Sequence, residues 1–149
     1  MINNVTISAM ADEKEIEFLR DKQSFNYTFD KTTIDSLREH FKLKDSLYLI
    51  AKKGEEFVAF CSIDRGWWEE NFFFIREILV DPNFQKLGMG EKLMARCIDY
   101  AKDRRATGVV TETAFENSPM QKLCEKLGFK KWDNPQWKSG ITYKLLLPT

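Results

Sequence analysis

The sequence has no excess of charge of either sign, because 23 Lys and Arg residues balance 23 Asp and Glu residues. It also lacks a basic cluster, so we do not expect nucleic acid as a partner. No apolar run approaches the roughly 20 residues that cross a bilayer, and the N-terminus lacks the basic-then-apolar order of a signal peptide. We therefore expect a cytoplasmic protein with no membrane partner.

Cysteine and histidine are also scarce. The three cysteines, Cys61, Cys97 and Cys124, are odd in number and stand in apolar contexts, which is typical of reduced core residues. His40, the only histidine, stands beside the apolar stripe of a predicted helix among charged residues. It is therefore interpreted as a surface residue, not a catalytic base. We expect neither a disulfide framework nor a metal site.

The composition is that of a globular domain, with 43% hydrophobic and 31% charged residues in a chain of 149. This length is enough for one core but not for two, so we expect a single domain over residues 1–149. Hydrophobic periodicity predicts strands near 5–10, 46–53, 56–64, 72–80, 108–113, 129–132 and 140–147. Helices are predicted to begin near Asp12, Thr32, Glu91 and Ser118, the last ending at Gly128. This order indicates a mixed sheet flanked by helices.

The stretch from Ile75 to Gly90 is the centre of this arrangement. An apolar strand stops at Asp81-Pro82, because proline cannot donate to the ladder. Two glycines, Gly88 and Gly90, then precede a helix with apolar residues at helical spacing. A strand that runs through a glycine loop into a helix N-terminus points free N–H groups at one place, which predicts an anion site.

The string Val-Asp-Pro-x-x-Gln-x-x-Gly-x-Gly, which ends at Gly90, resembles the acyl-CoA-binding motif of the GNAT superfamily of N-acetyltransferases. A second signature supports this resemblance, since Asn117 is followed at the family's spacing by Leu127, Gly128 and Phe129. The resemblance implies a mixed α/β, α+β-like fold. Its central mixed, largely antiparallel sheet would have six to seven strands, flanked by about four helices and splayed at the acyl-CoA site.

The resemblance also implies a cofactor site for acetyl-CoA, used as a co-substrate. In the family the strand before the glycine loop pairs with the pantetheine arm, and the loop amides hold the pyrophosphate. Carried over to this sequence, the expected cofactor-binding residues are Ile78, Leu79, Val80, Gln85, Lys86, Leu87, Gly88, Met89, Gly90 and Asn117. For Asn117, capping of the following helix is an alternative role.

Acetylation of an amine requires that an ammonium first lose a proton, often to a carboxylate through water. Glu112 matches a position where some family members keep a catalytic glutamate, and it is favoured as the base. Glu77, on the central strand, is the other candidate. Each could equally be a solvated or salt-bridged glutamate.

The sequence departs from the family at Cys124, which stands where the family usually has the tyrosine that protonates the leaving thiolate. A thiol with a pKa of about 8.5 could serve as this acid. A packing role is favoured, because Cys124 lies in the apolar stripe of Met120, Leu123 and Leu127. Tyr143, Tyr27 or solvent would then supply the proton.

The resemblance implies an acetyl-CoA-dependent N-acetyltransferase that transfers the acetyl group directly to a primary amine. Trp67, Trp68, Glu69, Glu70 and Tyr27 are the expected substrate-binding residues, because acidic and aromatic side chains suit a small cationic amine. A protein or peptide N-acetyltransferase and a non-catalytic acetyl-CoA-binding protein are the alternatives. The sequence also allows a homodimer.

Overall fold

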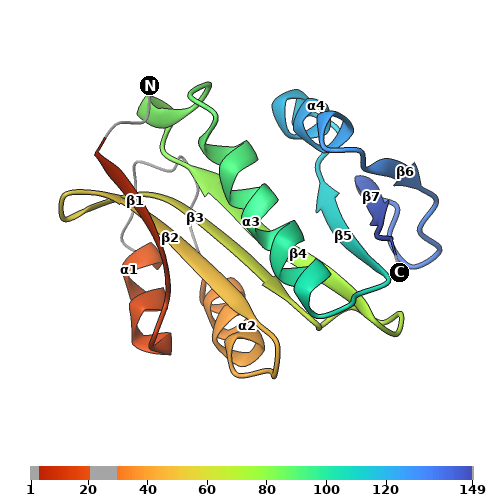
Figure 1. Ribbon diagram of the computed structural model, residues 1–149, viewed down its shortest axis with the longest axis horizontal. Helices are drawn as coiled ribbons and strands as arrows, with labels where there is room; N and C mark the ends of the chain where they lie inside the picture. The colour runs from red at the N-terminus through yellow and green to blue at the C-terminus, as the bar shows by residue number, and fades with distance from the viewer. Residues whose placement is uncertain (1–3, 21–29, 149) are drawn as a thin grey trace.

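The computed structural model describes residues 4–20 and 30–148, which form one open sheet with helices on both faces (Figure 1). The strands are β1 (Val5–Ala9), β2 (Leu47–Lys53), β3 (Glu56–Asp64), β4 (Phe72–Val80), β5 (Gly108–Thr113), β6 (Lys130–Trp132) and β7 (Ile141–Leu146). They lie in the order β1-β2-β3-β4-β5-β7-β6. Only β4 and β5 are parallel, and every other neighbouring pair is antiparallel. The predicted mixed, largely antiparallel sheet is confirmed.

The helices divide between the two faces of the sheet. A short 3-10 turn (Glu13–Ile16), α1 (Glu17–Arg20) and α2 (Lys31–Phe41) cover one face, and α3 (Met89–Asp103) and α4 (Ser118–Lys126) cover the other. Successive strand residues point to opposite faces. On β3, Phe60 therefore packs with α1 and α2, whereas Cys61 and Ile63 pack with α3.

The sheet opens beside β4. Strands β4 and β5 pair from Phe72 to Ile75 on β4, and Thr111 Oγ1 on β5 donates to the Ile75 carbonyl at 3.1 Å. The register between β3 and β4 shifts at this level, which marks a bulge at Arg76. A bulge bends a strand, so the end of β4 stays with β3 and separates from β5.

The N-cap residues of two helices lie one or two positions before the predicted caps. Asp30, not Thr32, caps α2 by accepting from the Thr33 amide at 2.7 Å. Asn117, not Ser118, caps α4 by accepting from the Met120 amide at 3.2 Å. In both cases a short carboxyl or amide side chain reaches the third amide of the helix.

Gly128 ends α4 in the left-handed region, at φ +96°, as predicted. Within the part of the chain that the structure describes, no helix is long and apolar enough to cross a membrane.

Candidate active site

Hydrogen bonds of Asp81 hold the loop between β4 and α3. Asp81 is buried; its amide donates to the Val58 carbonyl at 2.8 Å, and its Oδ1 accepts from the Asn83 amide at 2.9 Å. Lys86 and Gly88 then adopt positive φ values of 65° and 83°. These two reversals turn the chain into the first turn of α3.

The N-terminus of α3 has free donors. Gly88 is the N-cap residue and has no side chain to cap the helix. The amide of Lys92 makes the first helical bond, to the Gly88 carbonyl at 3.0 Å. The amides of Met89, Gly90 and Glu91 precede it and therefore have no acceptor within the helix. With the helix dipole, these donors favour an anion.

The two glycines serve different purposes. A Cβ on Gly88 would meet no atom within 4 Å, so the positive φ, and not a lack of space, accounts for the glycine. A Cβ on Gly90 would lie 3.3 Å from Leu123 Cδ2 on α4 and 3.8 Å from Ile78 Cδ1. Gly90 thus allows α3, α4 and β4 to approach closely.

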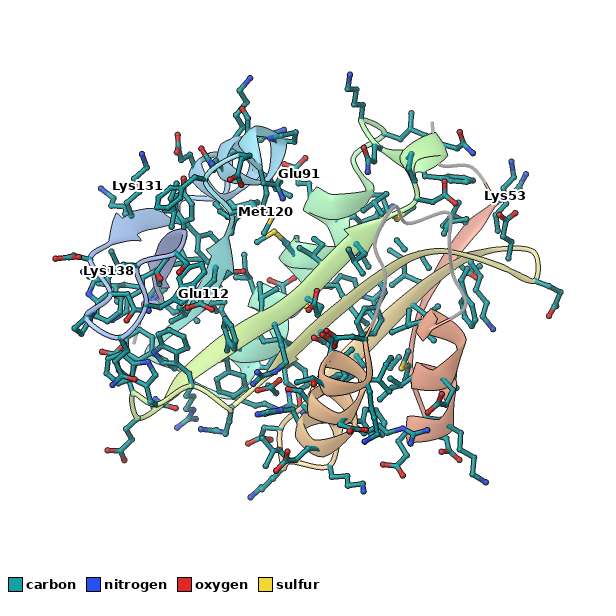
Figure 2. All side chains as sticks on the ribbon, turned by 180° about the vertical axis from the view of Figure 1, so that it is seen from behind. Lys53, Glu91, Glu112, Met120, Lys131 and Lys138 are labelled. Atoms are coloured by element: carbon teal, nitrogen blue, oxygen red, sulfur yellow. The ribbon has the colours of Figure 1, made fainter. Side chains whose placement is uncertain are left out.

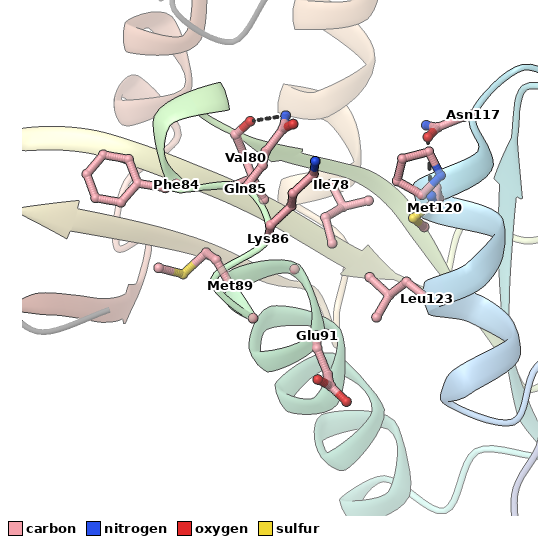
Figure 3. Close-up of a pocket in the computed structure, with 13 residues that line it drawn as sticks. Ile78, Val80, Phe84, Gln85, Lys86, Met89, Glu91, Asn117, Met120 and Leu123 are labelled. Carbon is pink, nitrogen blue, oxygen red and sulfur yellow. Dashed lines mark hydrogen bonds between the residues drawn. The ribbon is translucent and has the colours of Figure 1, made fainter. Parts of the chain in front are cut away.

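A cleft of about 410 Å³ lies between the end of β4, the N-terminus of α3 and the first turns of α4 (Figure 3). Of the expected cofactor-binding residues, those that line it are Ile78, Val80, Gln85, Lys86, Gly88, Met89, Gly90 and Asn117. Leu79 and Leu87 are not among its described lining residues. The side chain of Leu79 packs with the α1 and α2 core instead, and Leu87 is exposed.

Sequence reasoning missed five lining residues: Phe84, Glu91, Pro119, Met120 and Leu123. The α4 stripe was interpreted as core packing alone, although its periodicity also fits the wall of a cleft. Glu91 would repel an anion, but its carboxylate pairs with Lys126 on α4 at 3.2 Å.

Polar side chains at the rim of the cleft are already oriented. Gln85 Nε2 donates to the Val80 carbonyl at 3.0 Å, and Asn117 Oδ1 accepts the capping bond from Met120 (Figure 3). Asn117 therefore has the capping role that the sequence left open, while its position on the cleft wall also allows contact with a ligand.

Both candidate bases lie on the face of the sheet opposite α3 and α4. Glu77 pairs in register with Ser62 on β3, and Glu112 pairs with Thr142 on β7. Glu112 is labelled on β5 in Figure 2. Burial raises the pKa of Glu77 to about 7, although Arg76 opposes this rise. Burial also raises the pKa of Glu112, against the same guanidinium. Thus Arg76 interacts electrostatically with both carboxyl groups.

Arg76 is held by Asp64. Its Nε and Nη2 donate to the two carboxylate oxygens of Asp64, both at 2.9 Å, and Asp64 is fully buried. The Gly66 amide donates to the same carboxylate at 2.7 Å. This bidentate pair fixes the guanidinium next to the bulge and satisfies its charge.

The expected substrate-binding loop packs mostly against its own protein. Trp67 contacts Phe74 with ring centroids 5.1 Å apart, whereas Trp68 is 47% exposed. Glu69 accepts from Trp67 Nε1 at 2.9 Å and pairs with Lys144 at 2.6 Å. Glu70 is exposed, and Tyr27 lies outside the described residues.

Cys124 and Tyr143 lie on the α4 side of the sheet, and both are fully buried. Burial raises the pKa of the Cys124 thiol to about 12. Burial, followed by a hydrogen bond to Glu125 at 3.0 Å, raises the pKa of Tyr143 to about 12. Neither residue is among the described residues that line the cleft.

Solved acetyltransferases share this fold over nearly the whole chain. The ribosomal-protein-S18-alanine N-acetyltransferase of Escherichia coli superposes with a TM-score of 0.77 at 18% identity, covering 97% of this chain and 95% of that one. A protein from Salmonella typhimurium, solved with its cofactor acetyl-CoA, gives 0.74 at 18% identity and covers 98% and 95%. At these identities the likeness shows the fold alone.

The model of the acetyltransferase (GNAT) family matches residues 13–129, and the chain belongs to this family. An uncharacterized N-acetyltransferase of Methanocaldococcus jannaschii is 28% identical over 139 residues, which cover 87% of this chain. The chain spans 60% of that relative's length.

Proposed function

We propose that this protein is an acetyl-CoA-dependent N-acetyltransferase that transfers the acetyl group directly to a primary amine of a small cationic molecule. One observation carries the proposal: a cleft bordered by the free amides of α3 opens where β4 separates from β5. Residues 4–20 and 30–148 contain no cluster of side chains that could hold a metal ion, and the proposed transfer uses none.

The cleft suits acetyl-CoA in both charge and shape. The amides of Met89, Gly90 and Glu91 would bind the pyrophosphate at the N-terminus of α3. The pantetheine arm would lie along Ile78 to Val80, where β4 has left β5. About 410 Å³ is within the usual range of roughly 300–1,000 Å³ for small-molecule sites.

We assign the role of the base to Glu77. An alkylammonium has a pKa of about 10, so a base must remove its proton before the nitrogen attacks the thioester. A carboxylate with a pKa of about 7 is ionised at pH 8 and accepts a proton more readily than an ordinary glutamate. Glu112 lies on β5, across the opening.

The remaining steps need a donor to the oxyanion and a proton for the leaving thiolate. Backbone amides of β4 beyond Ile75, which have no β5 partner, can stabilise the oxyanion. Cys124 is buried in the core, and the Tyr143 hydroxyl is bonded to Glu125, so we assign the proton to solvent.

A two-part experiment tests this function. Acetyl-CoA at saturating concentration should raise the melting temperature, because a ligand that binds only the native state stabilises it, whereas NAD and ATP should not. A panel of primary amines should then show amine-dependent release of free CoA thiol. Absence of a thermal shift with acetyl-CoA would remove the proposal.

The second candidate function is that of a non-catalytic acetyl-CoA-binding protein. It is favoured by Cys124, which stands where the family usually has the tyrosine that protonates the leaving thiolate. Its signature would be a clear thermal shift without thiol release for any amine or peptide in the panel.

A further inference from the structure

We propose that the acceptor is a dication, in which one amine is acetylated beside Glu77 while a second cationic group binds Glu112. The inference rests on the proposed acetyl transfer. It adds that the acceptor is a dication and that Glu112 binds its second cationic group. It differs from the sequence-based expectation, which placed the cation on Glu69 and Glu70.

The first argument concerns charge on the acceptor face. Strands β4, β5 and β7 contain two cations, Arg76 and Lys144. Arg76 is bound by both oxygens of Asp64, and Lys144 is bound by Glu69. In contrast, neither Glu77 nor Glu112 makes a hydrogen bond or salt bridge to another described residue. The face therefore has two carboxyl groups that no cation of their own strands neutralises by direct contact.

The second argument concerns position. Glu77 and Glu112 both lie on the face opposite α3 and α4, where their register partners are Ser62 and Thr142. They are carried by different strands, β4 and β5, which part beyond Ile75. An acceptor that reaches the thioester from this face lies between two carboxyl groups. One positive group can satisfy only one of them.

A third, independent observation lies beside Glu77. Ser62 is fully buried, its register partner is Glu77, and its hydroxyl has no hydrogen-bond partner among residues 4–20 and 30–148. Directly opposed residues of an antiparallel pair point to the same face. An unbonded buried hydroxyl costs free energy. An amine bound at Glu77 would supply the missing partner.

Burial supports the same ligand. Transfer of a carboxylate out of water disfavours its charged form, which is the cause of the raised pKa at both glutamates. A second ammonium group at Glu112 restores the charged form there. A carboxylate at the far end of the acceptor would instead add repulsion between like charges.

Matched acceptors test the inference. Diamines of three to eight carbons are compared with monoamines and ω-amino acids of equal length, in the presence of acetyl-CoA. At the best length we expect kcat/KM for the diamine to exceed that for the monoamine at least 10-fold, and the ω-amino acid to be the poorest.

Glu112→Gln should reduce kcat/KM for the diamine about 10-fold more than it reduces kcat/KM for the monoamine. Glu116→Gln removes the same charge at an exposed site and should change neither. Circular dichroism and the acetyl-CoA thermal shift check that the variants are folded. Equal kcat/KM for diamine and monoamine at every length, or equal losses for both in Glu112→Gln, would overturn the inference.

Failure of the proposed function gives a different result. If no amine of any kind releases thiol, the acetyl transfer itself is wrong. If monoamines are acetylated without a preference for diamines, only the dication assignment is wrong.

Discussion

The two faces of the sheet, where β4 and β5 separate, are built by different means. On the α3 and α4 face, the cleft depends on backbone: a positive φ at Gly88, a close approach at Gly90 and the free amides of α3. On the opposite face, the proposed acceptor site depends on side chains whose charge is set by burial and by Arg76. Under the proposed function, the first face would bind the cofactor and the second would bind the acceptor.

The largest expected effect lies on the acceptor face. Glu77→Gln should lower kcat about 100-fold or more at pH 8, since loss of a positioned base usually costs this much. The acetyl-CoA dissociation constant should not change, because the cleft is on the other face. Steady-state kinetics and ligand titration measure the two quantities. Glu112→Gln, assayed with a monoamine, is the control, and an equal loss in both variants would contradict the assignment of the base.

The pH dependence of activity and of stability also tests the assignment of Glu77 as the base. A base works when it is ionised, so kcat/KM should rise with pH through a midpoint of about 7 and then level off, and this step should be absent in Glu77→Gln. Folding stability should have the opposite trend. The folded pKa lies above the ordinary value of 4.5, so the folded state binds more protons between these values and loses stability as pH rises. Thermal denaturation should therefore find Glu77→Gln more stable than the wild type at pH 8, with a smaller difference at pH 5.

The next effect is expected on the cofactor face. Gly88→Asp should weaken acetyl-CoA binding at least 10-fold relative to Gly88→Asn, because it puts a carboxylate at the proposed pyrophosphate site. Asp and Asn have the same shape, and both tolerate a positive φ better than most residues. Calorimetric titration gives the two affinities. Equal affinities would show that the pyrophosphate does not bind at the start of α3.

These differences explain how far the sequence could predict the molecule. Strand β4, the loop from Asp81 to Gly90 and helix α3 are local features, which the hydrophobic periodicity and the turn residues of the sequence predict. The fold and most of the cleft were therefore predictable. The family match to residues 13–129 agrees with them.

The acceptor face was less predictable, because its contacts join distant parts of the chain. Lys144 binds Glu69 across 75 residues of sequence, and the burial of Glu77 depends on the whole sheet. The direction of Glu112 likewise required the register with Thr142. The Lys144–Glu69 ion pair and the pairing of Glu112 with Thr142 have no local pattern in the sequence that would predict them.

A smaller effect is expected at Cys124, in the core that supports the cleft. Cys124→Ala should lower stability by about 1 kcal/mol through a small cavity and change kcat by no more than threefold. Cys124→Tyr should destabilise the fold more, because the site is fully buried and overpacking costs about 1–3 kcal/mol. Urea denaturation and kinetics measure both. A 100-fold loss of kcat in Cys124→Ala at unchanged stability would make Cys124 the acid.

The smallest kinetic effect is expected in the aromatic loop. Glu69 is already bound to Trp67 Nε1 and to Lys144, whose Nζ lies 3.4 Å from the centroid of the Trp132 ring. Glu69→Gln should therefore leave the amine KM within twofold. It should lower stability by roughly 1–2 kcal/mol, because it leaves a largely buried ammonium without its carboxylate.

Glu70→Gln is the matched control for this change, since Glu70 is exposed and its replacement should alter stability by no more than about 0.5 kcal/mol. Urea denaturation and amine kinetics on both variants separate a structural loop from a binding loop. A fivefold rise in amine KM at unchanged stability in Glu69→Gln would show that Glu69 contacts the acceptor. The acceptor site would then lie over the aromatic loop and not between Glu77 and Glu112.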